Sequence, residues 1–94
     1  MLTIVWLDEA IADLADIVSF IADENPAAAR NLKARLESAP LALVEHPYLY
    51  QVGRVSGTRE LVAHPNYVIV YRVAATRIEI VNVVHTRRQY PSRS

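Results

Sequence analysis

Arginine, histidine and tyrosine side chains gather in the last third of this 94-residue chain. They stand at or near the ends of apolar, β-branched runs and comprise Arg59, Arg72, His85, Arg87, Arg88 and Tyr90. Arginine makes fixed, bidentate contacts with carboxylates and phosphates, and it cannot act as a base. Histidine is the side chain that titrates near neutral pH. These residue types therefore indicate recognition of a polyanion or of an acidic partner.

Three apolar runs separated by short turns predict the strands that carry these side chains: 58–63, 67–73 and 77–84. Antiparallel pairing places Arg59 and Arg72 at one end of the sheet, and His85 with Arg87 at the other, beside the 64–66 turn. Strict alternation would put Glu79, Val81, Val83 and His85 on one face of the last strand, and Ile78, Ile80, Asn82 and Val84 on the other. Strand pairing alone thus does not bring the candidate residues into one cluster.

The first half of the chain predicts a strand followed by a helical hairpin. Residues 3–7 form a β-branched and aromatic run, and an amphipathic helix follows from Asp8 or Glu9. Its apolar side consists of Ile11, Leu14, Ala15, Val18, Ile21 and Ala22, with Asp13, Asp16 and Asp23 on the polar side. The Asn25-Pro26 pair ends this helix and starts the next. A kink or restart is expected between Ser38 and Pro40.

The order of these elements predicts an α+β fold with a single domain over residues 1–94, whose helices pack on one face of an antiparallel sheet. Strands 67–73 and 77–84 are near-continuous apolar runs, which indicates that both sheet faces are partly covered. The helical hairpin covers one face and leaves the other for a different contact. The turn between the first two of these strands is expected to hold Asn66 in the left-handed conformation.

Length and composition limit the functional classes. A domain of this size has a modest core and no room for an internal catalytic cavity, so an open working surface is expected. The chain has no cysteine, which is typical of a reducing cytoplasm and excludes a thiolate zinc site. The short apolar run at the start of the sequence is followed directly by Asp8 and Glu9, so we expect neither a signal peptide nor a membrane span.

Charge is segregated along the chain, although the formal net charge is zero. Residues 1–45 carry eight acidic and three basic side chains, whereas residues 46–94 carry seven arginines and two glutamates. The acidic helical half is thus joined to a basic sheet half. This distribution has two explanations: general solubility, or a sheet surface that faces a polyanion or an acidic partner.

The candidate residues also have structural explanations. Arg59 is able to pair with Glu60 or with a neighbouring strand, and Arg72 to extend from a strand edge into solvent. His85 suits a half-buried position and Tyr90 suits packing. His46, His64 and His85 lack the spacing of metal ligands, so no metal or cofactor is expected.

Four stretches of the chain resemble the RelE/ParE superfamily of bacterial toxins. They are A-x-x-D-L-x-x-I-x-x-x-I-A-x-x-N-P-x-A-A from Ala10, G-T-R-E-L-V from Gly57, Y-x-x-x-Y-R-V from Tyr67 and E-I-V-N-V-V-H-T-R-R-Q-Y-P from Glu79. The resemblance implies a toxin of a type II toxin–antitoxin module of the plasmid stabilisation kind. It also implies a cytoplasmic protein in a hetero-oligomer with a small DNA-binding antitoxin, whose C-terminal tail wraps the toxin.

Two branches of this superfamily imply different targets. In the RelE-like branch, which resembles ribosome-dependent mRNA endonucleases, Arg59 and Arg87 match phosphate-stabilising positions, Arg72 adds charge, and His85 or Tyr90 handles protons. That branch is strongly basic, whereas this chain is neutral and has no lysine after Lys33. In the ParE-like branch, which resembles inhibitors of DNA gyrase, these arginines and Arg88 contact target or antitoxin. The helical motif favours the ParE-like branch, and a regulatory module without toxicity is the third hypothesis.

Overall fold

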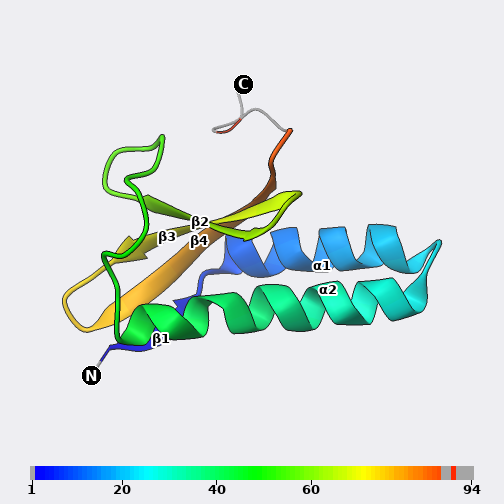
Figure 1. Cartoon of the computed structure of the whole chain (residues 1–94), viewed down its shortest axis with the longest axis horizontal. Coiled ribbons are helices and arrows are strands. Elements are labelled where there is room, and N and C mark those ends of the chain that lie inside the picture. Colours follow the sequence, from blue (N-terminus) through cyan, green and yellow to red (C-terminus); the bar gives the residue numbers. More distant parts are fainter. Residues whose placement is uncertain (1, 88–89, 91–94) are drawn as a thin grey trace.

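The structure is a computed structural model that describes residues 2–87 and 90. Its elements are β1 (Thr3–Trp6), α1 (Asp8–Ala22), α2 (Pro26–Ser38), the 3-10 helix η1 (Ala39–Val44), β2 (Arg59–His64), β3 (Tyr67–Val73) and β4 (Arg77–His85). Figure 1 shows α1 and α2 side by side against the sheet, with the turn between them projecting beyond the strands. The predicted α+β fold is therefore confirmed. Arg88 and residues 91–94 lie outside the described residues.

The sheet has the strand order β1-β4-β3-β2. The pairs β2–β3 and β3–β4 are antiparallel, as predicted, whereas β1 runs parallel to β4 with Thr3 opposite Arg77 and Trp6 opposite Ile80. The first strand of the chain therefore lies beside the last, and β2 and β1 form the two edges. Because β1 is shorter than β4, it leaves the edge of β4 uncovered beyond Ile80.

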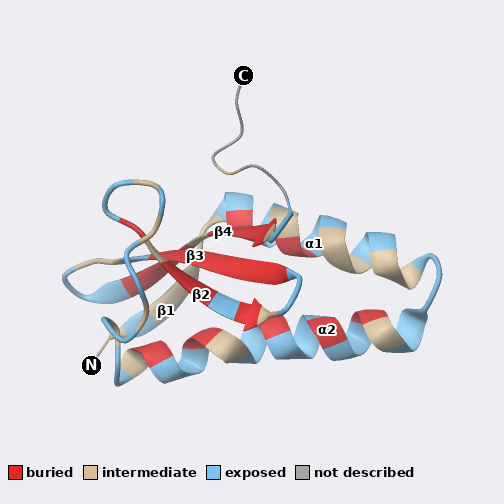
Figure 2. Cartoon of the chain, turned by 45° about the horizontal axis from the view of Figure 1, so that its top comes forward, coloured by how far each residue is buried: buried red, intermediate tan, exposed pale blue. Residues whose placement is uncertain are grey.

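The main core lies between the helices and one face of the sheet. Ala10 and Leu14 of α1, and Leu32 and Leu36 of α2, recur at the spacing of a helical stripe and are buried. They pack against alternate residues of the strands, including Tyr67, Ile69, Tyr71, Ile78 and Ile80. Figure 2 shows the buried residues of both helices on the side that faces the strands. Burial of this shared apolar surface is the main force that holds the hairpin on the sheet.

The helix boundaries follow from local chemistry. Asn25 is the N-cap of α2, where its side chain accepts a 3.0 Å hydrogen bond from Ala28 N–H, and Pro26 occupies the first turn. At the other end α2 stops at Ser38, and the chain continues as η1 with Pro40 buried. The predicted interruption between Ser38 and Pro40 is thus confirmed as a change from α-helix to 3-10 helix.

Strict alternation along the last strand is wrong, because β4 contains a bulge. Val70 pairs with Asn82 and Tyr71 with Ile80, so Val81 is an extra residue without a partner on β3. The extra residue shifts the side chains that follow it to the opposite face. Ile78, Ile80 and Val83 consequently face the helices, whereas Val84 belongs to a second cluster on the other face.

Two further local predictions differ from the structure. Asn66 is not left-handed: among the described residues only Gly57 has a positive φ, of 82°. Asp13 does not lie on a solvent-facing polar side of α1, since its carboxylate bonds to β4, while Ile11 from the predicted apolar stripe is exposed. The difference at Asp13 arises from its contact with β4, which helical periodicity does not contain.

Candidate functional surfaces

Arg59, at the start of β2, holds the connection between η1 and β2. Its Nη1 donates hydrogen bonds to the carbonyl of Tyr50 at 2.6 Å and to that of Tyr48 at 3.4 Å. The guanidinium also lies 5.0 Å from the centre of the Tyr48 ring, within cation–π range. Arg59 does not pair with Glu60, one of its two structural explanations, and Glu60 binds Arg54 instead. Arg59 therefore positions a loop.

Arg72 lies on the sheet face opposite the helices, where it shares a carboxylate with Arg77. Arg72 Nε donates to Glu79 Oε1 at 2.8 Å, and Arg77 Nε donates to Glu79 Oε2 at 2.8 Å. These hydrogen bonds, from Arg72 first and then Arg77, lower the pKa of Glu79 below its usual range. Glu79 is nearly covered while both arginines stay half exposed. One of the two positive charges on this part of the face is thus neutralised within the fold.

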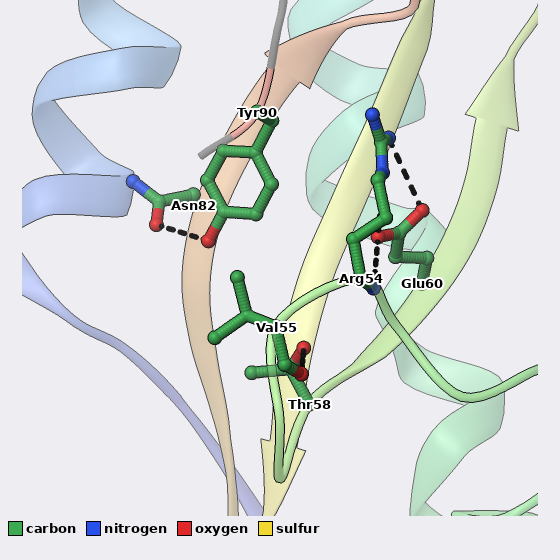
Figure 3. A network of polar contacts seen from close by, with 6 residues as sticks. All are labelled: Arg54, Val55, Thr58, Glu60, Asn82 and Tyr90. Atoms are coloured by element: carbon green, nitrogen blue, oxygen red, sulfur yellow. Dashed lines mark hydrogen bonds and ion pairs between the residues drawn. The ribbon is translucent and has the colours of Figure 1, made fainter. Parts of the chain in front are cut away.

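A second ion pair on the same face joins Arg54 to Glu60 (Figure 3). Glu60 Oε2 accepts hydrogen bonds from Arg54 N–H at 2.9 Å and from Arg54 Nε at 3.1 Å, and Oε1 accepts one from Nη2 at 3.2 Å. Burial of Glu60 opposes its ionisation, but the Arg54 bonds outweigh that cost, so the pKa of Glu60 is lowered. These three hydrogen bonds anchor the 51–57 loop over the sheet.

Tyr90 also packs over this face. Its ring lies against the cluster of Val68, Val70 and Val84, which is buried although no helix covers it. Figure 3 shows the Tyr90 hydroxyl directed at Asn82, to which it donates a 3.1 Å hydrogen bond. Burial, then the charges of Glu9, Glu60 and Asp13, raise the pKa of Tyr90. The hydroxyl is thus held protonated in a packing role.

His85 and Arg87 line a pocket of about 580 Å³ between α1 and the end of β4. Its other lining residues are Asp13, Asp16, Ile17, Phe20, Tyr67 and Val83. His85 Nδ1 accepts a 3.0 Å hydrogen bond from Arg87 N–H, so the proton of the neutral ring lies on Nε2. The ring stands edge-on to Tyr67 with 5.2 Å between the centroids. The pocket therefore places His85 Nε2–H, the exposed Arg87 and two aspartates beside the apolar side chains of Ile17, Phe20 and Val83.

The structure therefore distributes the predicted site residues over four places. Arg59 pairs with Tyr71 of β3, and His85 pairs with Tyr67 of the same strand. Tyr67 and Tyr71 are four residues apart, which corresponds to roughly 13 Å along β3. Arg72 lies on the opposite face of the sheet from both. His85 and Arg87 are brought together, Tyr90 stands over the valine cluster, and Arg88 is not among the described residues. The candidate residues thus do not form one cluster, in agreement with the predicted strand pairing.

Sequence reasoning missed two residues that organise these surfaces. The first is Arg54, whose pairing with Glu60 fixes the loop above the sheet. The second is Asp13, which helical spacing places on the polar side of α1 but which binds Asn82 and Val83 of β4. A carboxylate at each of positions 60 and 79, within otherwise apolar strands, is the signal that points to buried glutamates with arginine partners.

Within residues 2–87 and 90, no three His, Cys, Asp or Glu side chains come together as a metal site. None of the helices in the described part of the chain is long and apolar enough to cross a membrane.

Comparison with known proteins identifies the family. Residues 4–90 match the model of the ParE toxin of the type II toxin–antitoxin system parDE. The chain is 38% identical over 87 residues to the candidate toxin Y4kP of Sinorhizobium fredii, covering 92% of this chain and 90% of that protein. It is 39% identical over 90 residues to Toxin RelE2 of Caulobacter vibrioides, covering 94% and 99%.

The fold is also similar to two solved structures. A chain of the chromosomal ParDE system from P. aeruginosa superposes with a TM-score of 0.81 at 20% identity, over 90% of this chain and 96% of that one. YafQ from E. coli strain BL21(DE3) superposes with a TM-score of 0.61 at 12% identity, over 92% and 94%. Together with the matched motifs, these relationships show that the chain belongs to the ParE toxin family, the toxins of type II toxin–antitoxin systems in the RelE/ParE superfamily.

Proposed function

We propose that this toxin arrests growth by binding and inhibiting DNA gyrase, and that it does not cleave mRNA. The observation that carries the proposal is the separation of the candidate nuclease residues. Cleavage of RNA at its 2′-hydroxyl requires a base, an acid and charge-stabilising donors within hydrogen-bond reach of one phosphate. Roughly 13 Å of strand lies between the positions of Arg59 and His85, far beyond that reach.

The bonding of the individual side chains supports the same proposal. Arg59 binds two backbone carbonyls, Arg72 binds Glu79, and Tyr90 binds Asn82 with its hydroxyl held protonated. A phosphate would have to displace these partners before it could use the side chains. Arg72 and Arg77 share one carboxylate, so they offer less net charge to the dense cationic contact that ribosomal RNA requires. An inhibitor that acts by binding a protein has no such requirement.

The family implies a cognate antitoxin as partner. We propose that it is a small DNA-binding protein with a wrapping C-terminal tail, and that the two proteins form a hetero-oligomer in the cytoplasm. Val62 supports this arrangement, because it is exposed on the edge strand β2 beside Val68, where a bound tail could cover it. Plasmid stabilisation is the role that such a pair would serve.

One observation favours the alternative, a ribosome-dependent mRNA endonuclease: a relative at 39% identity carries the name Toxin RelE2. A direct comparison of the two activities tests the choice. Purified toxin is added to a gyrase supercoiling assay and, separately, to a translating extract whose mRNA is mapped by primer extension. We expect supercoiling to be lost, antitoxin to restore it, and the mRNA to stay intact.

The control is the variant Leu36→Asp, which places a carboxylate in the core and should be inactive in both assays. Codon-spaced cleavage by the wild-type protein with normal supercoiling would establish the endonuclease instead. Silence of the folded wild-type protein in both assays would identify a regulatory module without toxicity.

A further inference from the structure

Three large apolar side chains protrude from the connection between η1 and β2. Tyr48, Leu49 and Val52 are 65%, 64% and 70% exposed, and we call residues 48–52 the protruding loop. Figure 2 shows this connection as a largely exposed loop at one end of the sheet. Apolar groups that cluster on the surface commonly mark an interaction site.

The backbone of the protruding loop is fixed, although its side chains are exposed. Tyr71 O–H donates a 3.0 Å bond to Pro47 O, and Arg59 binds the carbonyls of Tyr48 and Tyr50. Glu60 N–H donates to Gln51 O at 3.1 Å. Just after the loop, Gly53 N–H donates to Thr58 O at 2.8 Å. A partner that binds here therefore meets apolar groups that are already ordered, which reduces the entropic cost of binding.

Arg59 gives this surface a distinctive charge. Arg54, Arg72 and Arg77 each bind a glutamate, whereas Arg59 has no carboxylate within ion-pair distance in the described part of the chain. Its Nη1 is occupied by carbonyls, which leaves the remaining N–H groups available beside the Tyr48 ring. The surface thus combines three apolar side chains with one cation that lacks a counter-ion.

We propose that the protruding loop is the surface through which this toxin docks onto its target protein. The complementary surface is an apolar cleft bordered by a carboxylate that pairs with Arg59. A nucleic-acid partner fits poorly, because one arginine does not supply the charge density that phosphate backbones require. This inference rests on the proposed function, in which the target is gyrase.

The test uses the double variant Leu49→Ser/Val52→Ser, which removes apolar surface and leaves Tyr48 stacked on Arg59. The matched control is Ile11→Ser, because Ile11 is 52% exposed and lies on α1 rather than in the loop. Thermal unfolding confirms that both variants are folded. Three properties are then measured: the toxin concentration for half-inhibition of supercoiling, growth arrest in cells, and binding to purified antitoxin.

We expect the concentration for half-inhibition of supercoiling to be about 30-fold higher for the double variant than for wild type, which is the loss typical of a binding hot spot. It should no longer arrest growth, it should bind antitoxin normally, and the control should behave as wild type. Unchanged inhibition by the double variant would overturn the inference. Loss of antitoxin binding with full inhibition would also overturn it, since the loop would then belong to the antitoxin interface. A dimeric wild type that becomes monomeric in the double variant would assign the loop to self-association.

Failure of the proposed function gives a different pattern. If wild-type protein arrests growth without inhibiting gyrase, the gyrase assignment is wrong while the loop remains testable through growth arrest. Loss of arrest in the double variant but not in the control would then support docking onto another protein. Retained arrest in both would refute the docking surface.

Discussion

Asp13 of α1 accepts a 2.9 Å hydrogen bond from the backbone N–H of Val83 in β4, at the edge that β1 leaves uncovered. The same carboxylate oxygen, Oδ2, accepts a 3.0 Å bond from Asn82 Nδ2, and Asn82 Oδ1 accepts from Tyr90. Asp13 therefore takes the place of a strand partner just after the bulge. Through Asn82 it connects α1 to the residue that covers the far side of the sheet.

We predict that Asp13→Ala lowers the free energy of unfolding by about 1–3 kcal/mol, because it leaves the Val83 N–H and the Asn82 amide without an acceptor. Urea unfolding measures this change. Asp16→Ala, at an exposed position one turn along α1, is the matched control and should differ little from wild type. Equal stability of the two variants would show that water replaces the carboxylate.

Acid should destabilise the protein through Glu79. Its pKa is lowered in the folded state by Arg72 and Arg77, so the unfolded chain takes up a proton at a higher pH than the native protein. The stabilisation is complete above the unfolded pKa of about 4.3 and is lost as the pH falls through the lower native value. Urea unfolding between about pH 3 and pH 6 should show that the free energy of unfolding falls less steeply with decreasing pH in Glu79→Gln than in wild type.

Glu24→Gln serves as the control, because Glu24 is exposed and forms no ion pair with another described residue. It should keep the acid dependence of wild type. If Glu79→Gln does the same, the shared carboxylate contributes no pH-dependent stability.

Arg59→Ala should lower the free energy of unfolding, whether or not Arg59 also contacts the target. The variant loses charge-assisted bonds to the carbonyls of Tyr48 and Tyr50, and we expect a loss of about 1–3 kcal/mol. Limited proteolysis should also cut the 48–52 segment faster, since its backbone is no longer held. A variant with wild-type stability and wild-type cleavage would remove Arg59 from its structural role.

Arg87→Ala should relieve growth arrest without unfolding the domain. Arg87 is exposed at the mouth of the pocket beside His85, and substitution of such a surface residue changes stability by no more than about 0.5 kcal/mol. The measurement is colony formation after induction, with circular dichroism to confirm the fold. Arg30→Ala, on the exposed side of α2, is the control for the loss of one positive charge. Full toxicity of folded Arg87→Ala would show that Arg87 and its pocket beside His85 do not contribute to growth arrest.

Local patterns predicted most of the fold. The bounds of β3 agree with the predicted strand 67–73, because turn residues flank a run that is rich in β-branched and aromatic side chains. The Asn25-Pro26 boundary was equally predictable, since its capping chemistry involves only neighbours in sequence. The bulge at Val81 was not, because it depends on how β4 meets β3. One extra residue there reversed the faces assigned to Asn82, Val83, Val84 and His85.

The candidate site was less predictable than the fold. The residue types were found from the sequence, and His85 and Arg87 do lie together beside the 64–66 turn. Their chemical roles depend on partners that are distant in sequence. Glu79 reaches Arg72 across the strand pair, and Arg59 reaches carbonyls in a loop that has no sequence signature.

By itself the sequence determined the class of fold, the family, and the presence of apolar residues on both faces of the central strands, since periodicity, turn chemistry and matched motifs are local properties. Only the tertiary structure decided that β1 lies beside β4, that three of the arginines bind glutamates, and that Arg59 and His85 stand at opposite ends of β3. The physical reason is that an ion pair or a strand register depends on which segments meet in space. The free energy of that meeting comes from burying the shared core rather than from any one stretch of the chain.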